Sequence, residues 1–113
     1  MIQRGQGWLA DLGQPRGHEQ AYKRPVVILQ IDSLNYLNTV MVVPLTSRTD
    51  RGNSATTVSV HPSEGGLDRP SVALCHQLRA LDARKLESHL GELPPERLYE
   101  IEAAVAFVLG LPL

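Results

Sequence analysis

The sequence predicts a mainly β fold with one C-terminal α-helix, arranged as a small, strongly bent sheet or barrel with the helix packed on it. Five or so short stretches have the β-branched or alternating apolar pattern of strands, and turn-forming residues separate them. Near the C-terminus, apolar residues recur at spacings of three and four, which is typical of an amphipathic helix. With 113 residues the chain is long enough for one core, so we expect a small α+β protein with a single domain over residues 1–113.

Three strands are predicted in the first 45 residues. Residues 8–12 alternate in polarity and predict the first, and residues 13–20, with two glycines and a proline, predict a loop after it. Residues 25–31 are a β-branched run that predicts a buried central strand, and Pro25 is permitted as its first residue. After turn-forming residues, a strand is predicted over residues 39–45, where Pro44 leads us to expect an edge or a bulge.

The remaining elements follow in the second half of the chain. A polar loop precedes a strand over residues 56–60. A turn-rich link then leads to a strand that starts at Ser71, and the pattern allows this strand to continue through Arg79. Residues 82–86 predict a short helical turn. The final helix should begin at Pro94-Pro95 and end at Gly110 and Pro112. Its apolar face should consist of Leu98, Ile101, Ala104, Val105, Val108 and Leu109.

Composition narrows the class of protein. Hydrophobic residues make up 42% and charged residues 20% of the chain, which is ordinary globular usage. No apolar run reaches the roughly 18 residues that a membrane span needs, and no signal peptide is recognisable, so we expect a cytoplasmic protein with no membrane association. The net charge is −1, but residues 1–60 hold six basic and four acidic side chains. If the chain binds a polyanion, the N-terminal half is the better face, but the asymmetry alone favours ordinary solvated charges.

Common catalytic motifs are missing from the sequence. There is no Gly-rich phosphate loop, no His-Glu-x-x-His and no Gly-x-Ser-x-Gly. Cys75 lies in an apolar strand pattern, which favours a buried and unreactive thiol. The four histidines have no metal-ligand spacing, so we expect no metal and no cofactor. These histidines are His18, His61, His76 and His89.

One set of residues could carry chemistry. A polar loop leads into Lys23 and Arg24 at the start of a buried strand, and the next strand ends in Thr46, Ser47 and Arg48. If the two strands pair antiparallel, their ends could bring Arg24 and Thr46 together on a rigid support. Spacing alone favours the simpler interpretation, in which Lys23-Arg24 is a solvated turn and Thr46-Ser47 an ordinary strand terminus.

At these positions the sequence resembles the MazF/PemK toxin family. The resemblance extends along nearly the whole chain, in the order that the family has. The matching residues are Arg4-Gly5, Trp8, Gly17–Gln20, Lys23–Leu29, Asp32, Asn35, Val42–Ser47, Ser71–Leu74, Gln77–Arg79, Asp82, Leu86 and Gly91.

The resemblance implies an SH3-like barrel with a terminal helix and a two-fold homodimer. It also implies a toxin of a type II toxin-antitoxin system that cleaves single-stranded messenger RNA at short sequences without a metal. Arg24 and Thr46 match the family's catalytic positions. Seven further residues are candidates for catalysis or RNA contact. Some match the family's mobile loop or a position near its RNA groove, and the others lie close in sequence to the two catalytic positions. The seven residues are His18, Glu19, Gln20, Lys23, Ser47, Arg48 and Gln77.

Metal-free cleavage uses the ribose 2′-hydroxyl as nucleophile on the adjacent phosphate, and it needs a base, an acid and donors for the developing charge. Arg24 suits the last task and could donate a proton, but it stays protonated and cannot easily be the base. We therefore expect His18 or Glu19 to help as base. The sequence departs from the family at Cys75-His76 and Ala80-Leu81, which puts the RNA sequence preference in doubt.

The family class also implies partners and leaves alternatives open. We expect a small MazE-like antitoxin whose acidic, disordered tail covers the loops at residues 13–24 and 47–55, and contact with operator DNA only indirectly, through the antitoxin complex. A dimer should leave a large apolar patch on the isolated chain. The alternatives are a non-catalytic SH3-like binding module, a gyrase-poisoning toxin resembling CcdB, and a degenerate toxin homologue that acts only in antitoxin binding and autoregulation.

Overall fold

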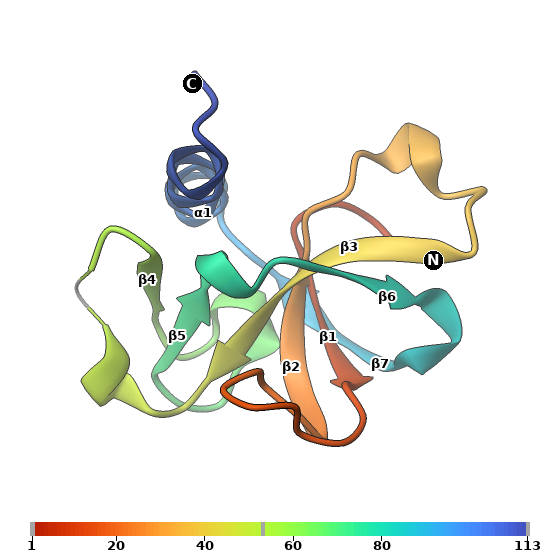
Figure 1. Cartoon of the computed structure of the whole chain (residues 1–113), viewed down its shortest axis with the longest axis horizontal. Helices are drawn as coiled ribbons and strands as arrows, with labels where there is room; N and C mark the ends of the chain where they lie inside the picture. The colour runs from red at the N-terminus through yellow and green to blue at the C-terminus, as the bar shows by residue number, and fades with distance from the viewer. Residues whose placement is uncertain (1, 53, 113) are drawn as a thin grey trace.

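The computed structural model describes residues 2–52 and 54–112 (Figure 1). Within these residues the chain forms seven strands followed by one α-helix, so the predicted mainly β fold with a C-terminal helix is confirmed. The elements are β1 (Gln6–Asp11), β2 (Lys23–Ile28), β3 (Thr39–Thr46), β4 (Thr57–Val60), β5 (Ser71–Leu74), β6 (Arg79–Asp82), β7 (Leu86–Glu92) and α1 (Pro95–Leu109). None of the helices described is both long and apolar enough to cross a membrane.

The strands pair in the order β4-β5-β3-β2-β1-β7, with every pairing antiparallel. Strand β3 has a second partner, because Thr39–Val42 pair with β6 whereas Leu45 and Thr46 pair with β5. The sheet therefore bends along β3, which runs diagonally between the two halves in Figure 1.

The edge or bulge expected at Pro44 is wrong, since β3 lies inside the sheet and its register with β2 is continuous from Val42 to Pro44. On one side, Pro44 is opposite Val26 of β2. On the other side, it follows Val42, the last residue paired with β6, and precedes Leu45, the first residue paired with β5. The missing N–H of proline thus removes no ladder hydrogen bond at this point.

Two further expectations need correction. The strand from Ser71 stops at Leu74, because Cys75–Gln77 form a 3-10 turn, η4, before β6 begins at Arg79. Strand β7 was not expected, and its register with β1 shifts at two points, which breaks the polarity alternation that identifies a strand. The helical turn expected near residue 84 is present as a 3-10 turn over Ala83–Lys85.

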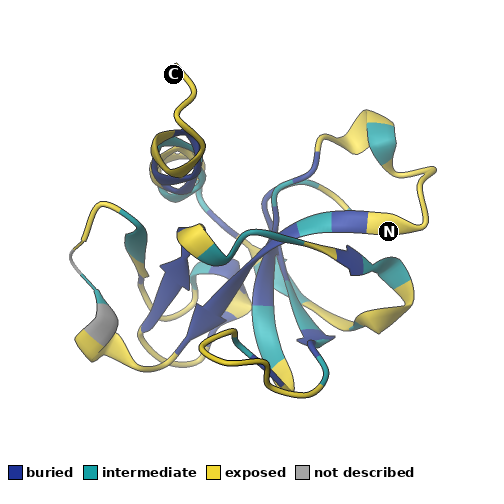
Figure 2. Ribbon diagram, viewed as in Figure 1, coloured by how far each residue is buried: buried dark blue, intermediate teal, exposed yellow. Residues whose placement is uncertain are grey.

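The two central strands are buried on both faces (Figure 2). Val26 and Ile28 of β2 enter one apolar cluster, with Leu81 of β6, whereas Val27 enters a second cluster that includes Ile101 of α1. Because neither face meets water, the sequences of β2 and β3 are nearly continuous apolar runs rather than alternating ones.

Helix α1 begins and ends as the sequence predicts. Proline occupies its first turn, and Gly110 adopts a left-handed conformation (φ 70°) whose N–H bonds back to the helix. Ile101 and Val105 pack into the core. Val108 and Leu109, expected on the same apolar face, are 37% and 53% exposed, because the helix extends beyond the core at this end.

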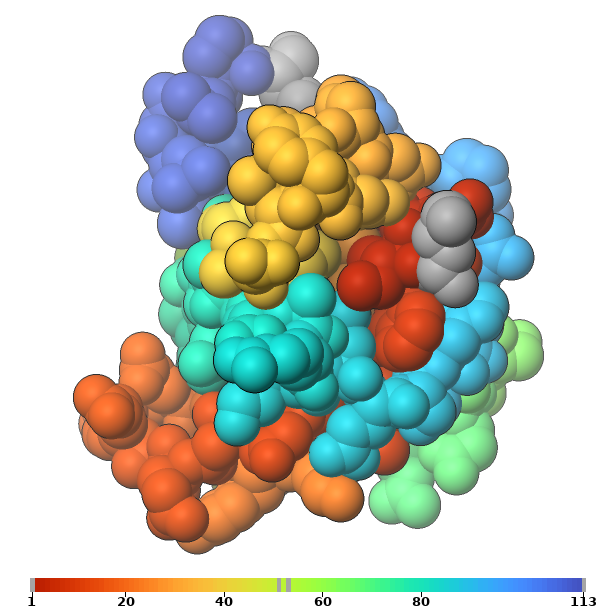
Figure 3. All heavy atoms as spheres, turned by 90° about the vertical axis from the view of Figure 1, so that its right-hand side faces the viewer, coloured from red at the N-terminus to blue at the C-terminus, as the bar shows by residue number. Residues whose placement is uncertain are grey.

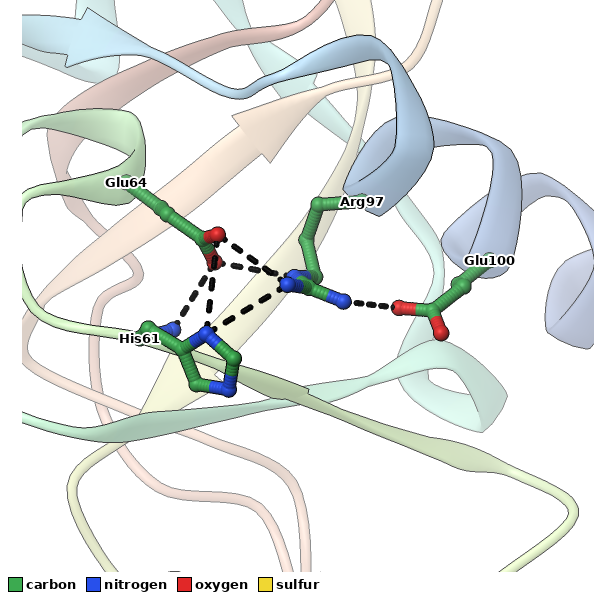
Figure 4. Close-up of polar contacts among 4 residues, drawn as sticks. All are labelled: His61, Glu64, Arg97 and Glu100. Atoms are coloured by element: carbon green, nitrogen blue, oxygen red, sulfur yellow. Dashed lines mark hydrogen bonds and ion pairs between the residues drawn. The ribbon is translucent and has the colours of Figure 1, made fainter.

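A polar cluster joins α1 to the turn η3 (Glu64–Gly66) (Figure 4). Arg97 Nε donates to Glu64 Oε1 at 2.9 Å and Arg97 Nη2 to Oε2 at 3.1 Å, and Arg97 also bonds Glu100 and His61. Hydrogen bonds from Arg97 are the main cause of the lowered pKa of Glu64. The cluster fixes η3 against the helix.

On its other side, η3 packs backbone against backbone on β1 and β7. A Cβ atom on Gly91 would lie 2.6 Å from the nitrogen of Gly66, and one on Gly66 would lie 2.0 Å from the carbonyl oxygen of Leu90. Side chains therefore cannot be accommodated at this contact. The tight fit sets the path of residues 67–71, which continue from η3 into β5.

Candidate active site

The ends of β2 and β3 bring Arg24 and Thr46 to one place. Val26 pairs with Pro44, and continuing this antiparallel register by two residues puts Arg24 opposite Thr46. Both side chains line the same pocket of about 240 Å³. Lys23 and Ser47, two further candidates from the sequence, line it as well.

Thr46 is 3% exposed, and its hydroxyl oxygen accepts a hydrogen bond from the backbone N–H of Arg48 at 3.2 Å. This bond uses a lone pair of the oxygen and leaves the hydroxyl hydrogen to be donated into the pocket. The residue is thus a fixed, nearly buried donor at the end of a central strand.

Arg24 is half-buried, and its Nε donates to the carbonyl oxygen of Ala21 at 3.3 Å. This bond orients the guanidinium and leaves its two terminal amino groups for a ligand. In the described part of the chain no carboxylate forms an ion pair with Arg24, although Asp68 lines the same pocket. A pocket with such a cation and a hydroxyl donor is suited to a phosphate group.

A third segment, missed by sequence reasoning, completes the pocket. Leu67, Asp68, Arg69 and Ser71 line it, and the buried Ser71 hydroxyl donates to the carbonyl oxygen of Arg69 at 3.3 Å. In the sequence these residues read only as a turn-rich link. Their position depends on the glycine contact and on the Arg97–Glu64 pair, which a local pattern cannot reveal.

The loop over residues 13–22 borders the site and stands out from the body of the molecule, orange-red in Figure 3. Its base is closed by two backbone hydrogen bonds, from Leu12 to Tyr22 (2.8 Å) and from Tyr22 to Gly13 (2.7 Å). Its tip is tied to η4 by the amide of Gln77, which accepts from Gln20 N at 2.8 Å and donates to His18 O at 3.2 Å. Gln77 is thus a clamp on the loop.

The remaining candidates lie outside the pocket of Arg24. Glu19 and Gln77 line a second pocket of about 170 Å³, together with Arg79. His18 is exposed on the loop, whereas the side-chain oxygen of Gln20 is buried without a hydrogen-bond partner in the described structure.

The last candidate, Arg48, and the expectations about metal and Cys75 can also be compared with the structure. Arg48 is exposed and pairs with Asp50, Nη2 to Oδ2, at 3.2 Å. Within residues 2–52 and 54–112, no three His, Cys, Asp or Glu side chains are grouped to hold a metal ion. Cys75 is fully buried, as the sequence predicts, and burial raises the pKa of its thiol to about 12.

Comparisons with known proteins agree with this architecture. An endoribonuclease in complex with its cognate antitoxin, from a mycobacterial species, is 28% identical with a TM-score of 0.82, and the match covers 100% of this chain and 99% of that one. MazF from Deinococcus radiodurans is 26% identical with a TM-score of 0.83 over 97% of both chains. In a MazE–MazF structure from the same organism the identity is 25% and the TM-score 0.74, over 98% of this chain and 97% of that one. The model of PemK-like, MazF-like toxins of type II toxin-antitoxin systems matches residues 3–109, so this chain belongs to that toxin family.

Proposed function

We propose that this toxin is a sequence-specific endoribonuclease that cleaves single-stranded messenger RNA without a metal ion. The observation that carries the proposal is the pocket in which the guanidinium of Arg24 lies beside the buried hydroxyl of Thr46. Two of the similar structures are endoribonucleases, which supports the same activity for this chain.

The proposed reaction is an attack of the ribose 2′-oxygen on the adjacent phosphorus. The new O–P bond closes a 2′,3′-cyclic phosphate, and the P–O5′ bond breaks to give a 5′-hydroxyl. Negative charge develops on the phosphate oxygens, where the two free amino groups of Arg24 and the hydroxyl of Thr46 supply hydrogen bonds. Lys23 adds positive charge at the pocket mouth, although part of it is offset by an ion pair with Glu87 at 3.3 Å.

A base must take the 2′-hydroxyl proton, and an acid must protonate the leaving 5′-oxygen. A guanidinium is a poor base, so Arg24 is assigned to stabilising charge and to donating a proton to the leaving 5′-oxygen. We assign the base to His18 or Glu19, which the Gln77 clamp holds on the loop bordering the pocket. An activity profile that stays flat between about pH 5 and 8, where histidine titrates, would leave Glu19 as the base.

The first experiment is cleavage of a mixed-sequence single-stranded RNA in EDTA by the wild-type protein, Arg24→Ala and Thr46→Ala. Arg84→Ala is the matched control, because Arg84 is exposed and pairs with Asp82 away from the pocket. We expect cuts at a short recurring sequence, 5′-hydroxyl products, and a loss of roughly 10²- to 10³-fold in the two pocket variants. A 2′-deoxy nucleotide at the cut position should block cleavage.

Absence of cutting by the wild-type protein, or equal cutting by the Arg24 and Arg84 variants, would overturn the catalytic proposal. The protein would then be interpreted as a binding module or as a homologue that acts only through its antitoxin. A requirement for added divalent cations would overturn the metal-free reaction alone.

We further propose that the toxin works in the cytoplasm as a homodimer, with a MazE-like antitoxin whose acidic tail competes with RNA for the pocket. Large apolar side chains at the end of α1, Phe107 and Leu109, are exposed and support an interface between two copies. Contact with operator DNA is assigned to the antitoxin in the complex. Light scattering of the purified protein tests the dimer, and inhibition of cleavage by an acidic peptide tests the competition.

A further inference from the structure

We propose that Arg16 and Arg79 form a second phosphate-binding subsite for the RNA backbone, beside the loop over residues 13–22. The inference rests on the proposed RNA cleavage and extends its binding surface beyond the pocket of Arg24 and Thr46. It assigns a role to two arginines that the catalytic proposal does not use.

The first support is the distribution of arginine charge. Among the arginines whose side chains are described, five form ion pairs with carboxylates: Arg4, Arg48, Arg69, Arg84 and Arg97. The three that form none with a described carboxylate are Arg16, Arg24 and Arg79. All three lie on or beside the same loop, so positive charge that is free for a polyanion is concentrated there.

The second support is a pocket that joins two of them. Arg16 and Arg79 line a pocket of about 470 Å³ together with Glu19 and the start of the loop at residues 12–14. The two guanidinium groups come from separate parts of the chain, one from the loop and the other from the first residue of β6. Two guanidinium groups that line one pocket can offer several N–H donors to a phosphate bound there.

The third support is that the loop is held in place. The backbone N–H of Glu19 donates to the carbonyl oxygen of Arg16 at 3.2 Å, which keeps these two residues in one turn. The Gln77 clamp ties that turn to η4, and Arg79 follows Gln77 by two residues. The backbone that carries Arg16 and Glu19 is therefore held before a ligand binds, which lowers the entropy cost of binding.

Glu19 determines the kind of ligand. Its carboxylate repels a bare anion, but it can accept a hydrogen bond from a ribose hydroxyl or from an amino group of a base. A nucleotide presents such a donor next to its phosphate. The combination of two arginines with one carboxylate thus favours a nucleotide of the substrate strand.

The subsite is within reach of the catalytic pocket. Glu19 and Arg24 are five residues apart in the chain, so their Cα atoms are separated by at most ~18 Å. A strand that lies in the pocket of Arg24 can therefore continue over the loop and place a phosphate a few nucleotides away between Arg16 and Arg79.

The test measures affinity for a single-stranded RNA of about twelve nucleotides that carries a 2′-deoxy nucleotide at the cut position and is not cleaved. Fluorescence anisotropy compares the wild-type protein with Arg16→Gln, Arg79→Gln and the control Arg84→Gln, at several salt concentrations. We expect each subsite variant to bind about 5- to 10-fold more weakly. The slope of log K against log salt should become shallower by about 0.7 for each phosphate that the variant no longer neutralises. Glu19→Gln keeps a hydrogen-bond acceptor for the nucleotide and removes a charge that repels phosphate, so it should bind more tightly.

Substrate length supplies an independent readout. An RNA cut down to the two nucleotides on either side of the cleaved bond cannot reach the subsite, so its cleavage should be the same in Arg16→Gln, Arg79→Gln and wild type. Thermal unfolding of each variant verifies the fold, and Arg16 is exposed enough to be replaced without loss of packing.

The two proposals fail in different ways. If the wild-type protein neither binds nor cuts RNA, the proposed function is wrong and the proposed subsite is wrong as well. If the wild-type protein cuts RNA but the Arg16 and Arg79 variants match Arg84→Gln in affinity and salt slope, the subsite is wrong and the catalytic pocket stands.

Discussion

Replacing Gly66 with alanine should destabilise the protein by about 2–4 kcal/mol. Gly66 has a φ of +77°, and a left-handed conformation costs about 1–2 kcal/mol for a residue with a Cβ atom. The added Cβ would also lie 2.0 Å from the carbonyl oxygen of Leu90, and such overpacking costs about 1–3 kcal/mol. Alanine also restricts the unfolded chain more than glycine does, which offsets about 0.4–1 kcal/mol of the lost stability.

Two other glycines separate these contributions. Gly13 has a φ of +81° but no heavy atom within 4 Å of a Cβ, so Gly13→Ala should lose about 1 kcal/mol or less, from backbone conformation alone. Gly91 lies outside the left-handed region, yet its Cβ would approach Gly66 N to 2.6 Å, so Gly91→Ala should lose about 1–2 kcal/mol from the clash.

Urea unfolding at one protein concentration measures the three variants, and the melting temperature should change by about 4 °C for each kcal/mol. The expected order of stability is Gly13→Ala, then Gly91→Ala, then Gly66→Ala. Equal losses in Gly13→Ala and Gly66→Ala would show that the close backbone contact of η3 does not matter for stability, and the reasoning would be refuted.

Three further predictions concern the core and its charges. Glu64→Gln should lower the melting temperature at pH 7. The difference from wild type should shrink as the pH falls below about 4.5, because a carboxylate with a lowered pKa in the folded state loses its stabilising effect when it is protonated. A difference that does not change with pH would contradict the role of the Arg97 pair. Ile101→Ala, at a fully buried position, should lose about 2–5 kcal/mol in urea unfolding, whereas Val108→Ala on the same helix should lose less than about 1 kcal/mol. Cys75 should not react with a thiol reagent at pH 8 until denaturant unfolds the chain, and rapid labelling of the folded protein would show that the thiol is accessible.

The sequence was sufficient for the elements whose own residues determine them. The β-branched run of β2 and the proline and glycine at the ends of α1 predict those elements because the signals are local. Strand β7 escaped prediction because its polarity alternation is broken where its register with β1 shifts, and that shift depends on a neighbouring strand.

The candidate site was predictable to the same degree. Arg24 and Thr46 could be placed together from antiparallel pairing and from a family resemblance, since both lie on predicted strands. The segment with Asp68 and Arg69 could not, because its path is fixed by contacts between residues far apart in the sequence. Arg16 and Arg79, which form no ion pair with a described carboxylate, could not be predicted as a pair either, because it is the fold that places both at one pocket.

Strand β3 links regions that would otherwise be independent. Its first residues are hydrogen-bonded in the half-sheet that contains β6, and its last residue is the buried threonine of the candidate active site. A local opening that releases the whole of β3 from one half should therefore also break its hydrogen bonds in the other half. Its backbone amides should be among the slowest in the protein to exchange with deuterium, and their exchange should report global unfolding rather than local fluctuation.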